Sequence, residues 1–133
     1  FLFNFKIIVK TNKKNQINKN FIKMKEIKIV QKVKSIYNIY KTIDLAISAC
    51  GNSAFELGYL GVPTIHFTNE KREIKRAKLF EKEKLGVFCY PENKKKLVNE
   101  INKLYINSNY RKKLSLRRIN YFRKKNLLVN LFS

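Results

Sequence analysis

The sequence has no tryptophan, one histidine, two cysteines, two prolines and four glycines in 133 residues. The shortage of histidine and cysteine weighs against a zinc or redox centre. Cys50 and Cys89 are far apart, form no CxxC motif and have no histidine near them in sequence. We therefore expect two buried free thiols in a cytoplasmic protein, and no metal or other cofactor.

Long apolar runs are also absent. A membrane-spanning helix needs roughly 20 apolar residues in succession, and Lys or Asn interrupts every candidate segment. The opening FLFNFKIIVK has no basic leader before its apolar residues and no small-residue cleavage site, so it makes a poor signal peptide. It also has no initiator methionine, which favours a fragment of a longer protein over a complete chain.

Acidic residues are few. Nine Asp and Glu oppose 30 Lys and Arg, which gives a net charge of +21. Such a charge favours anionic partners such as nucleic acid, a membrane surface or a phosphate group. Lysine is spread over nearly every segment and asparagine is equally overused, however, which indicates a coding bias as much as a binding surface. The aromatic residues form no stacking platform and no RRM or KH motif is present, so nucleic acid is disfavoured.

Apolar periodicity and turn residues predict alternating strands and helices. Strands are expected at residues 3–10, 27–33, 44–50, 62–67 and 87–90, and helices at 16–24, 36–43, 54–60, 70–84, 94–106 and 110–128. This order implies a mainly parallel sheet with helices on both faces, a Rossmann-like three-layer α/β/α domain. At this length we expect one domain over residues 1–133.

Some details of burial follow from the same patterns. The continuous apolar run at 44–50 predicts the most buried strand. The helix at 70–84 is expected to turn Ile74, Ala77, Leu79 and Phe80 inward and to be closed by Gly86.

The stretch DLAISACGNSAFELGYLGVPTIHF, residues 44–67, holds three of the four glycines. One interpretation is structural: Gly51 makes a turn, Ser53 and Glu56 form an S-x-x-E capping box, and Gly61 ends the helix before a proline. The other is functional. In parallel sheets, ligands bind where the carboxyl ends of strands lead into helices, and the N–H groups of a Gly-Asn-Ser turn suit a phosphate or diphosphate. The GxGxxG and GxxxxGK[ST] signatures are absent.

A family resemblance favours the functional interpretation. The segment DLAISACGNSAFELGYLGVPTIHFTNEKREIKRAKLFEKEKLGVF resembles the carboxyl-terminal nucleotide-binding half of GT-B-fold sugar-nucleotide enzymes. It is most similar to the UDP-sugar hydrolases of the pseudaminic acid pathway, and it is also similar to the glycosyltransferase family that adds N-acetylglucosamine to lipid I. D-L-A-I-S, the Gly-polar-Ser turn, E-L-x-x-L-G-V-P and the charged helix with Arg-Ala carry the resemblance. It covers residues 44–87 well; the two end segments match only in the order of helices and strands.

The resemblance implies a binding site at the turn. Gly51, Asn52 and Ser53 match the Gly-Gly-Ser type turn that receives the diphosphate of a UDP-sugar. Glu56 matches the acidic residue that meets the nucleotide ribose. A capping box would compete for the same carboxylate, and we favour the ribose role.

A second set of residues follows the strand at 62–67. Asn69 and Glu70 fall where these families place residues facing the sugar, whereas Arg72 and Glu73 replace an Asn-Gln pair often seen there, which leaves sugar specificity and activity open. His66 is the sole histidine and has no Asp or Ser partner in sequence, so we favour packing over a general-base role. No catalytic residue is assigned, because in the resembling hydrolases the catalytic histidine belongs to the amino-terminal half.

These observations predict the UDP-sugar-binding domain of a sugar-nucleotide hydrolase in surface-glycan biosynthesis, working with an amino-terminal domain that is missing here. One alternative is the carboxyl-terminal domain of a GT-B glycosyltransferase with a UDP-sugar donor. Another is a non-catalytic basic domain that binds RNA or an anionic membrane. For the basic segment RKKLSLRRINYFRKK we favour packing within the fold over peripheral membrane contact. Two or three of the residues Lys71, Arg72, Lys75 and Arg76 could face the diphosphate, but we favour a solvated cationic face.

Overall fold

The computed structural model describes residues 7–10, 19–22, 27–30 and 34–124. The chain divides into two compact units, residues 1–36 and 37–133. In the first, strands β1 (Ile7–Lys10) and β2 (Ile27–Val30) pair in parallel, and helix α1 (Lys19–Ile22) lies between them in sequence. This confirms the predicted strand–helix–strand order. The other residues of these predicted elements, including 3–6 and 31–33, lie outside the described residues.

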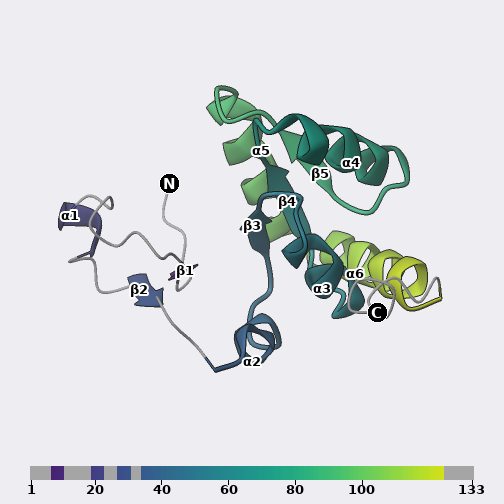
Figure 1. The fold of residues 1–133 in the computed structure, drawn as a ribbon, viewed down its shortest axis with the longest axis horizontal. Coiled ribbons are helices and arrows are strands. Elements are labelled where there is room, and N and C mark those ends of the chain that lie inside the picture. Colours follow the sequence, from purple (N-terminus) through teal and green to yellow (C-terminus); the bar gives the residue numbers. More distant parts are fainter. Residues whose placement is uncertain (1–6, 11–18, 23–26, 31–33, 125–133) are drawn as a thin grey trace. The chain divides into compact units, whose positions relative to one another are not determined.

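The second unit is an α/β sandwich built on a parallel sheet with strand order β3-β4-β5 (Figure 1). Its strands are β3 (Ala46–Ser48), β4 (Thr64–Phe67) and β5 (Val87–Cys89). Its described helices are α2 (Ile36–Tyr40), α3 (Ser53–Tyr59), α4 (Lys71–Lys82), α5 (Lys94–Ile106) and α6 (Ser108–Lys124). The alternation confirms the predicted Rossmann-like α/β class. The predicted continuation of the last helix to residue 128 lies outside the described residues.

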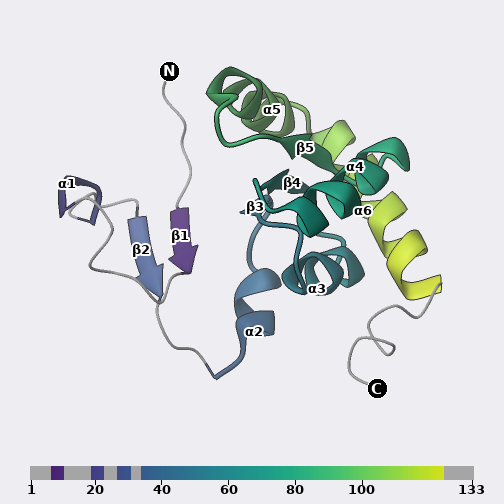
Figure 2. The same ribbon diagram turned by 45° about the horizontal axis from the view of Figure 1, so that its top comes forward.

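Apolar side chains form a core on each face of the sheet, which gives the three layers seen in Figure 2. We call the first the α3/α4 core; its buried members are Cys50, Ala54, Ala77, Phe80, Leu85, Phe88 and Phe122. We call the second the α5 core; its buried members are Ile65, Val87, Cys89, Leu104 and Leu114. Successive strand residues such as Val87 and Phe88 enter opposite cores because side chains alternate across a strand.

The most buried strands are β4 and β5, and the prediction for residues 44–50 was wrong. In the described sheet β3 lies at an edge, and Ile47 in it is 49% exposed. The central strand β4 has Thr64, Ile65 and His66 fully buried. A continuous apolar run indicates a buried segment but does not distinguish a central strand from an edge strand.

Helix α3 ends at Gly61, as predicted. Gly61 has a φ of 71°. Its N–H donates to the Gly58 carbonyl at 3.0 Å, and the Val62 N–H donates to the Leu57 carbonyl at 2.9 Å. This is the Schellman arrangement, in which a left-handed residue satisfies the last carbonyls of the helix, and glycine adopts that conformation without steric cost.

Helix α4 ends with the same arrangement, but at Lys84 and not at the predicted Gly86. Lys84 has a φ of 58°. Its N–H donates to the Glu81 carbonyl at 3.0 Å, and the Leu85 N–H donates to the Phe80 carbonyl at 2.8 Å. Gly86 serves close packing instead, because a Cβ there would lie 2.9 Å from a backbone oxygen of β4.

Replacing Lys84 with glycine is expected to stabilise the domain by about 0.5–1 kcal/mol, because a left-handed φ strains any side chain with a Cβ. Urea denaturation would show this as a higher midpoint. Lys75→Gly, at an exposed position inside α4, is the matched control and should lose about 1 kcal/mol. If both variants lose stability, Lys84 does not have the left-handed conformation.

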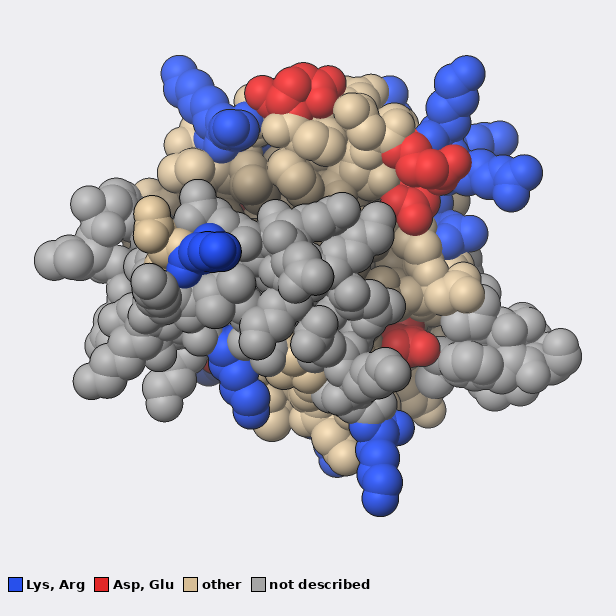
Figure 3. Space-filling model, turned by 60° about the vertical axis from the view of Figure 1, so that its left-hand side comes forward, with Lys and Arg blue, Asp and Glu red and all other residues tan. Residues whose placement is uncertain are grey.

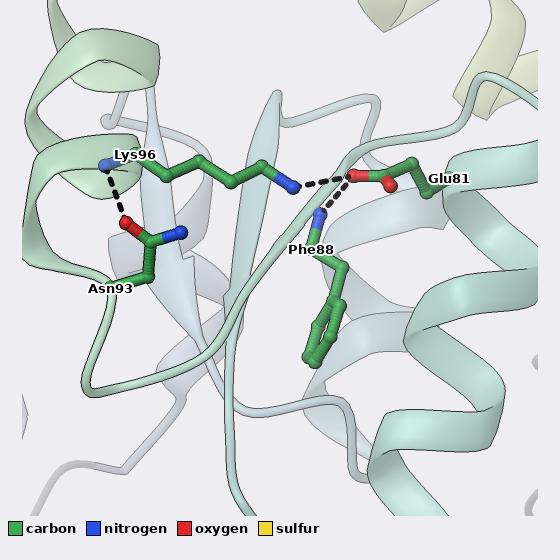
Figure 4. Close-up of polar contacts among 4 residues, drawn as sticks. All are labelled: Glu81, Phe88, Asn93 and Lys96. Atoms are coloured by element: carbon green, nitrogen blue, oxygen red, sulfur yellow. Dashed lines mark hydrogen bonds and ion pairs between the residues drawn. The ribbon is translucent and has the colours of Figure 1, made fainter.

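A carboxylate near the end of α4 joins that helix to β5 and α5 (Figure 4). Glu81 accepts the Phe88 N–H at 2.7 Å and lies 3.5 Å from the Lys96 ammonium. Asn93 caps α5 by accepting the Lys96 N–H at 3.1 Å. The Glu81–Lys96 ion pair is exposed and contributes little by itself, so the bond to the backbone of β5 is the stronger constraint.

Helix α6 begins at Ser108, two residues before its predicted start, because Asn107 caps it by accepting the Tyr110 N–H at 2.9 Å. Leu114 then enters the α5 core and Phe122 enters the α3/α4 core. The helix therefore covers part of both faces of the sheet. This confirms the packing interpretation of the basic carboxyl-terminal segment.

Candidate functional site

Two loops leave the sheet side by side, at the carboxyl ends of β3 and β4. Ser48 pairs with His66 across these parallel strands. The first loop, residues 49–52, leads into α3, and the second, residues 68–70, leads into α4. The structure therefore brings both predicted sets of site residues to the carboxyl ends of the strands, where parallel α/β sheets bind ligands.

The turn after β3 has backbone amides without a protein acceptor. The Gly51 carbonyl accepts the Ala54 N–H at 3.2 Å, and the Asn52 carbonyl accepts the Phe55 N–H at 3.1 Å. Within the described residues, no hydrogen bond is donated by the N–H groups of Gly51, Asn52 or Ser53. Asn52 is exposed, and its two neighbours are half-buried. Three adjacent N–H donors are therefore available at the predicted diphosphate turn.

The predicted capping box is absent. Asn52, and not Ser53, precedes α3, and it already has helical dihedral angles (φ −63°, ψ −35°). This places Ser53 inside the helix, where its hydroxyl lies 3.1 Å from the Ser48 hydroxyl. The helix has no side-chain cap, so the Glu56 carboxylate is not held by one. The ribose role of Glu56 stays a prediction.

Glu56 is half-buried and acts electrostatically on Tyr40, the last residue of α2. Its negative charge adds to burial in raising the pKa of Tyr40, burial being the larger cause. Both effects disfavour ionisation of the phenol.

The first turn of α4 packs closely against the Gly51 turn. A Cβ on Gly51 would lie 3.2 Å from Glu73 Oε1. The other carboxylate oxygen of Glu73 accepts the Thr68 hydroxyl at 2.6 Å. Because Gly51 has no side chain, the Glu73 carboxylate in the first turn of α4 can approach the first loop.

Arg76 also joins α4 to this turn. Its Nη1 donates to the Cys50 carbonyl at 2.9 Å, and its guanidinium lies 4.9 Å from the centre of the Phe55 ring. The predicted solvated face is therefore wrong for Arg76, whereas Lys71, Arg72 and Lys75 are exposed. Helical spacing could have indicated this position. Arg76 lies three residues after Glu73 and four before Phe80, which places it on the inward side of the helix.

The second loop presents Asn69 and Glu70 at the surface, and both are exposed. Glu70 caps α4 by accepting the Glu73 N–H at 3.0 Å, and its own N–H donates to the Thr68 hydroxyl at 3.2 Å. Any contact between Glu70 and a sugar would compete with this cap. Asn69 has no such constraint among the described contacts.

Residues 2–128 match the sequence model of the family described as the glycosyltransferase family 28 C-terminal domain. The chain belongs to this family. Membership supports the alternative that we named, the carboxyl-terminal half of a GT-B glycosyltransferase, and implies that the domain binds a nucleotide-sugar donor. It does not show the hydrolase that the sequence favours. A comparison with curated proteins gave no match.

In this family 28 domain, His66 packs in the core. It is fully buried, and its ring lies 5.6 Å from that of Phe80. Burial, with a smaller contribution from Arg118, lowers the pKa of His66 to about 3. A neutral imidazole with no exposed surface does not reach a substrate proton, so the structure favours the packing role.

Cys50 and Cys89 are free and buried, as predicted. Burial raises the pKa of the Cys50 thiol to about 12, so the thiol stays protonated at neutral pH. In the described part of the chain, no group of three or more His, Cys, Asp or Glu could hold a metal ion. None of the described helices is long and apolar enough to cross a membrane.

On the face shown in Figure 3, some Lys and Arg side chains gather at the upper right beside Asp and Glu, and others project singly from the described surface. An open groove of about 820 Å³ lies at the other end of the sheet, beside Asp44 and Pro63, which precede β3 and β4. None of the predicted site residues lines it.

Proposed function

We propose that this family 28 domain binds a UDP-sugar and forms the donor-binding half of a glycosyltransferase in surface-glycan biosynthesis. One observation carries the proposal: three N–H groups without a protein acceptor lie at the carboxyl end of β3, in a chain whose family binds nucleotide-sugar donors. Such amides suit a diphosphate. A single domain over residues 1–133, acting in the cytoplasm, is part of the proposal.

The proposed roles follow from position. The N–H groups of Gly51, Asn52 and Ser53 hold the diphosphate and stabilise the negative charge that grows on it as the glycosidic bond breaks. The Glu56 carboxylate accepts ribose hydroxyls. Asn69 and Glu70 contact the sugar from the second loop. The second half of the enzyme supplies the acceptor site and the general base, so this half contributes binding and orientation.

Uridine nucleotides test the proposal directly. At a UDP concentration of about 100 times the dissociation constant, the chain should gain about 2.7 kcal/mol of stability and melt at a higher temperature. ADP and GDP are the matched controls and should give smaller shifts. No shift with UDP would contradict the proposal. Tight RNA binding that falls steeply with salt would favour the alternative of a basic RNA-binding domain.

A negative charge at the turn should weaken UDP binding. Ser53→Asp places a carboxylate beside the proposed diphosphate and is expected to weaken UDP binding at least about tenfold by repulsion. Ser53→Asn, of similar size and uncharged, is the matched control and should retain most of the affinity. Calorimetric titration of both variants decides the point. Equal affinities would remove the turn from the site.

A hydrolase of the pseudaminic acid type remains a second candidate, because residues 44–87 resemble that family. The two reactions share the donor site and differ in whether water or a hydroxyl-bearing acceptor attacks the sugar. The longer enzyme that contains this domain would distinguish them. Release of UDP and free sugar without any acceptor indicates hydrolysis, and release that requires an acceptor indicates transfer.

A further inference from the structure

The most deeply buried charge in the described residues belongs to Arg118, in the middle of α6. Its side chain has no exposed surface. Its Nη1 donates to the carbonyl of Leu85, just before β5. Its Nη2 donates to the carbonyl of Ala54, in the first turn of α3, at 3.4 Å. The guanidinium also lies 5.3 Å from the centre of the Phe122 ring. A single side chain thus joins α6 to α3 and β5.

No described carboxylate neutralises this cation. The ion pair between described residues joins Lys96 and Glu81, on other elements. The titratable neighbours of Arg118 are Cys50 and His66. With a pKa of about 12 for the Cys50 thiol and about 3 for the His66 imidazole, both are neutral at pH 7. Burial lowers the pKa of Arg118 to about 10, so its guanidinium stays charged.

An unpaired buried charge is costly, and proteins usually pair or remove it. The hydrogen bonds to two carbonyls offset part of the free-energy cost of burying the charge. Arg118 Nε, however, has no hydrogen-bond partner among the described residues. An uncharged side chain of similar length would fill the same space more cheaply. The charge itself therefore needs an explanation beyond packing.

The position of Arg118 relative to the turn explains why its charge is kept. Its neighbours Cys50 and Ala54 directly flank residues 51–53, whose N–H groups have no acceptor in the described protein. The cation thus lies on the buried side of the turn that the proposed function assigns to the diphosphate. Arg118, Cys50 and Ala54 are all fully buried, so the attraction between the guanidinium and a diphosphate at the turn is screened less than it would be in water.

We propose that Arg118 is a positioning residue of the donor site, whose unpaired charge favours a diphosphate at the Gly51–Ser53 turn. This inference rests on the proposed function. It adds that recognition of the diphosphate depends on a residue of α6 that touches no ligand. Arg118 holds the first turn of α3 in place through the Ala54 carbonyl and supplies the positive potential behind it.

The test compares UDP with uridine, which lacks the phosphates. In the 133-residue chain, Arg118→Met should lower UDP affinity about tenfold or more and leave uridine affinity within about twofold. Arg118→Lys keeps the charge and should retain most of the preference for UDP. Lys113→Met, which removes an exposed charge from the same helix, is the matched control and should change neither affinity appreciably.

The outcomes separate the two proposals. If the unmodified chain binds no UDP, the proposed function fails and this inference fails with it. If the chain binds UDP and Arg118→Met weakens UDP and uridine equally, Arg118 is only structural and the inference alone is overturned.

If Arg118→Met does not fold, a measurement on the unmodified chain tests the inference instead. Among the described residues Arg118 is the sole fully buried arginine, so its Nε–H should be the slowest of the arginine Nε–H groups to exchange with solvent. That NMR signal should shift with UDP and not with uridine. The same response to both ligands would contradict the inference.

Discussion

Gly58→Ala is expected to destabilise the domain by about 2–3 kcal/mol, although alanine is the better helix former. A Cβ on Gly58 would lie 2.3 Å from two atoms of the Phe122 ring, well inside van der Waals contact. The ring has little room to move, because Phe80 and Tyr121 pack against it with ring centres 5.4 and 5.2 Å away. Helices α3 and α6 would have to separate. Urea denaturation would show the loss as a lower midpoint.

A double-mutant cycle identifies the cause. Phe122→Ala removes the Cγ, Cδ2 and Cε2 atoms that the new methyl group would meet. In that background Gly58→Ala should cost less than half as much, since neighbouring sites couple through shared space. Equal costs in the two backgrounds would mean that the methyl group clashes elsewhere. A gain in stability from Gly58→Ala alone would show that the helices lie farther apart than described.

Stability is expected to fall by a few kcal/mol as the pH drops from about 6.5 towards 3, through His66. Burial first, and then the charge of Arg118, lowers the pKa of His66 from 6.5 to about 3 in the folded chain. Between these values the unfolded chain binds a proton that the folded chain does not. Stability therefore rises with pH across this window, by at most about 1.4 kcal/mol per pH unit from this group. Above pH 6.5 the contribution of His66 is constant.

Denaturation of the unmodified chain and of His66→Leu across this pH range isolates the histidine. Leucine fills similar space and does not titrate, so its stability curve should be flatter between pH 6.5 and 3. Carboxyl groups contribute to both curves and cancel in the difference. Parallel curves would mean that His66 titrates normally. Because the chain has one histidine, its NMR titration gives the pKa without assignment.

The order of helices and strands was predictable because glycine, proline and apolar spacing mark it locally. Gly61 is an example: a glycine after an apolar helical face, followed by a proline, predicted the left-handed cap that the structure has. Lys84 has the same left-handed conformation without any such mark, and the prediction placed the end of the helix at Gly86. Leu79 was predicted to point inward and is 48% exposed, because it lies off the face shared by Ala77 and Phe80.

The backbone geometry of the candidate site was predictable from the sequence, and the contacts of its side chains were less so. The Gly-Asn-Ser turn and the meeting of the two loops follow from the order of parallel strands. Contacts that support the turn come from distant residues, and the sequence alone does not show which cation turns inward. Arg118 lies beside Arg117 in a helix rich in both Lys and Arg, yet only Arg118 is buried. The roles of Glu56, Asn69 and Glu70 stay predictions.

The position of α6 has a consequence for how the chain is made. Leu114 and Phe122 complete the cores on the two sides of the sheet. During translation, neither side can close until residue 122 has left the ribosomal exit tunnel. Until then the nascent strands expose surfaces that aggregate readily. Folding of the sheet is therefore expected to be completed only after α6 has been synthesised.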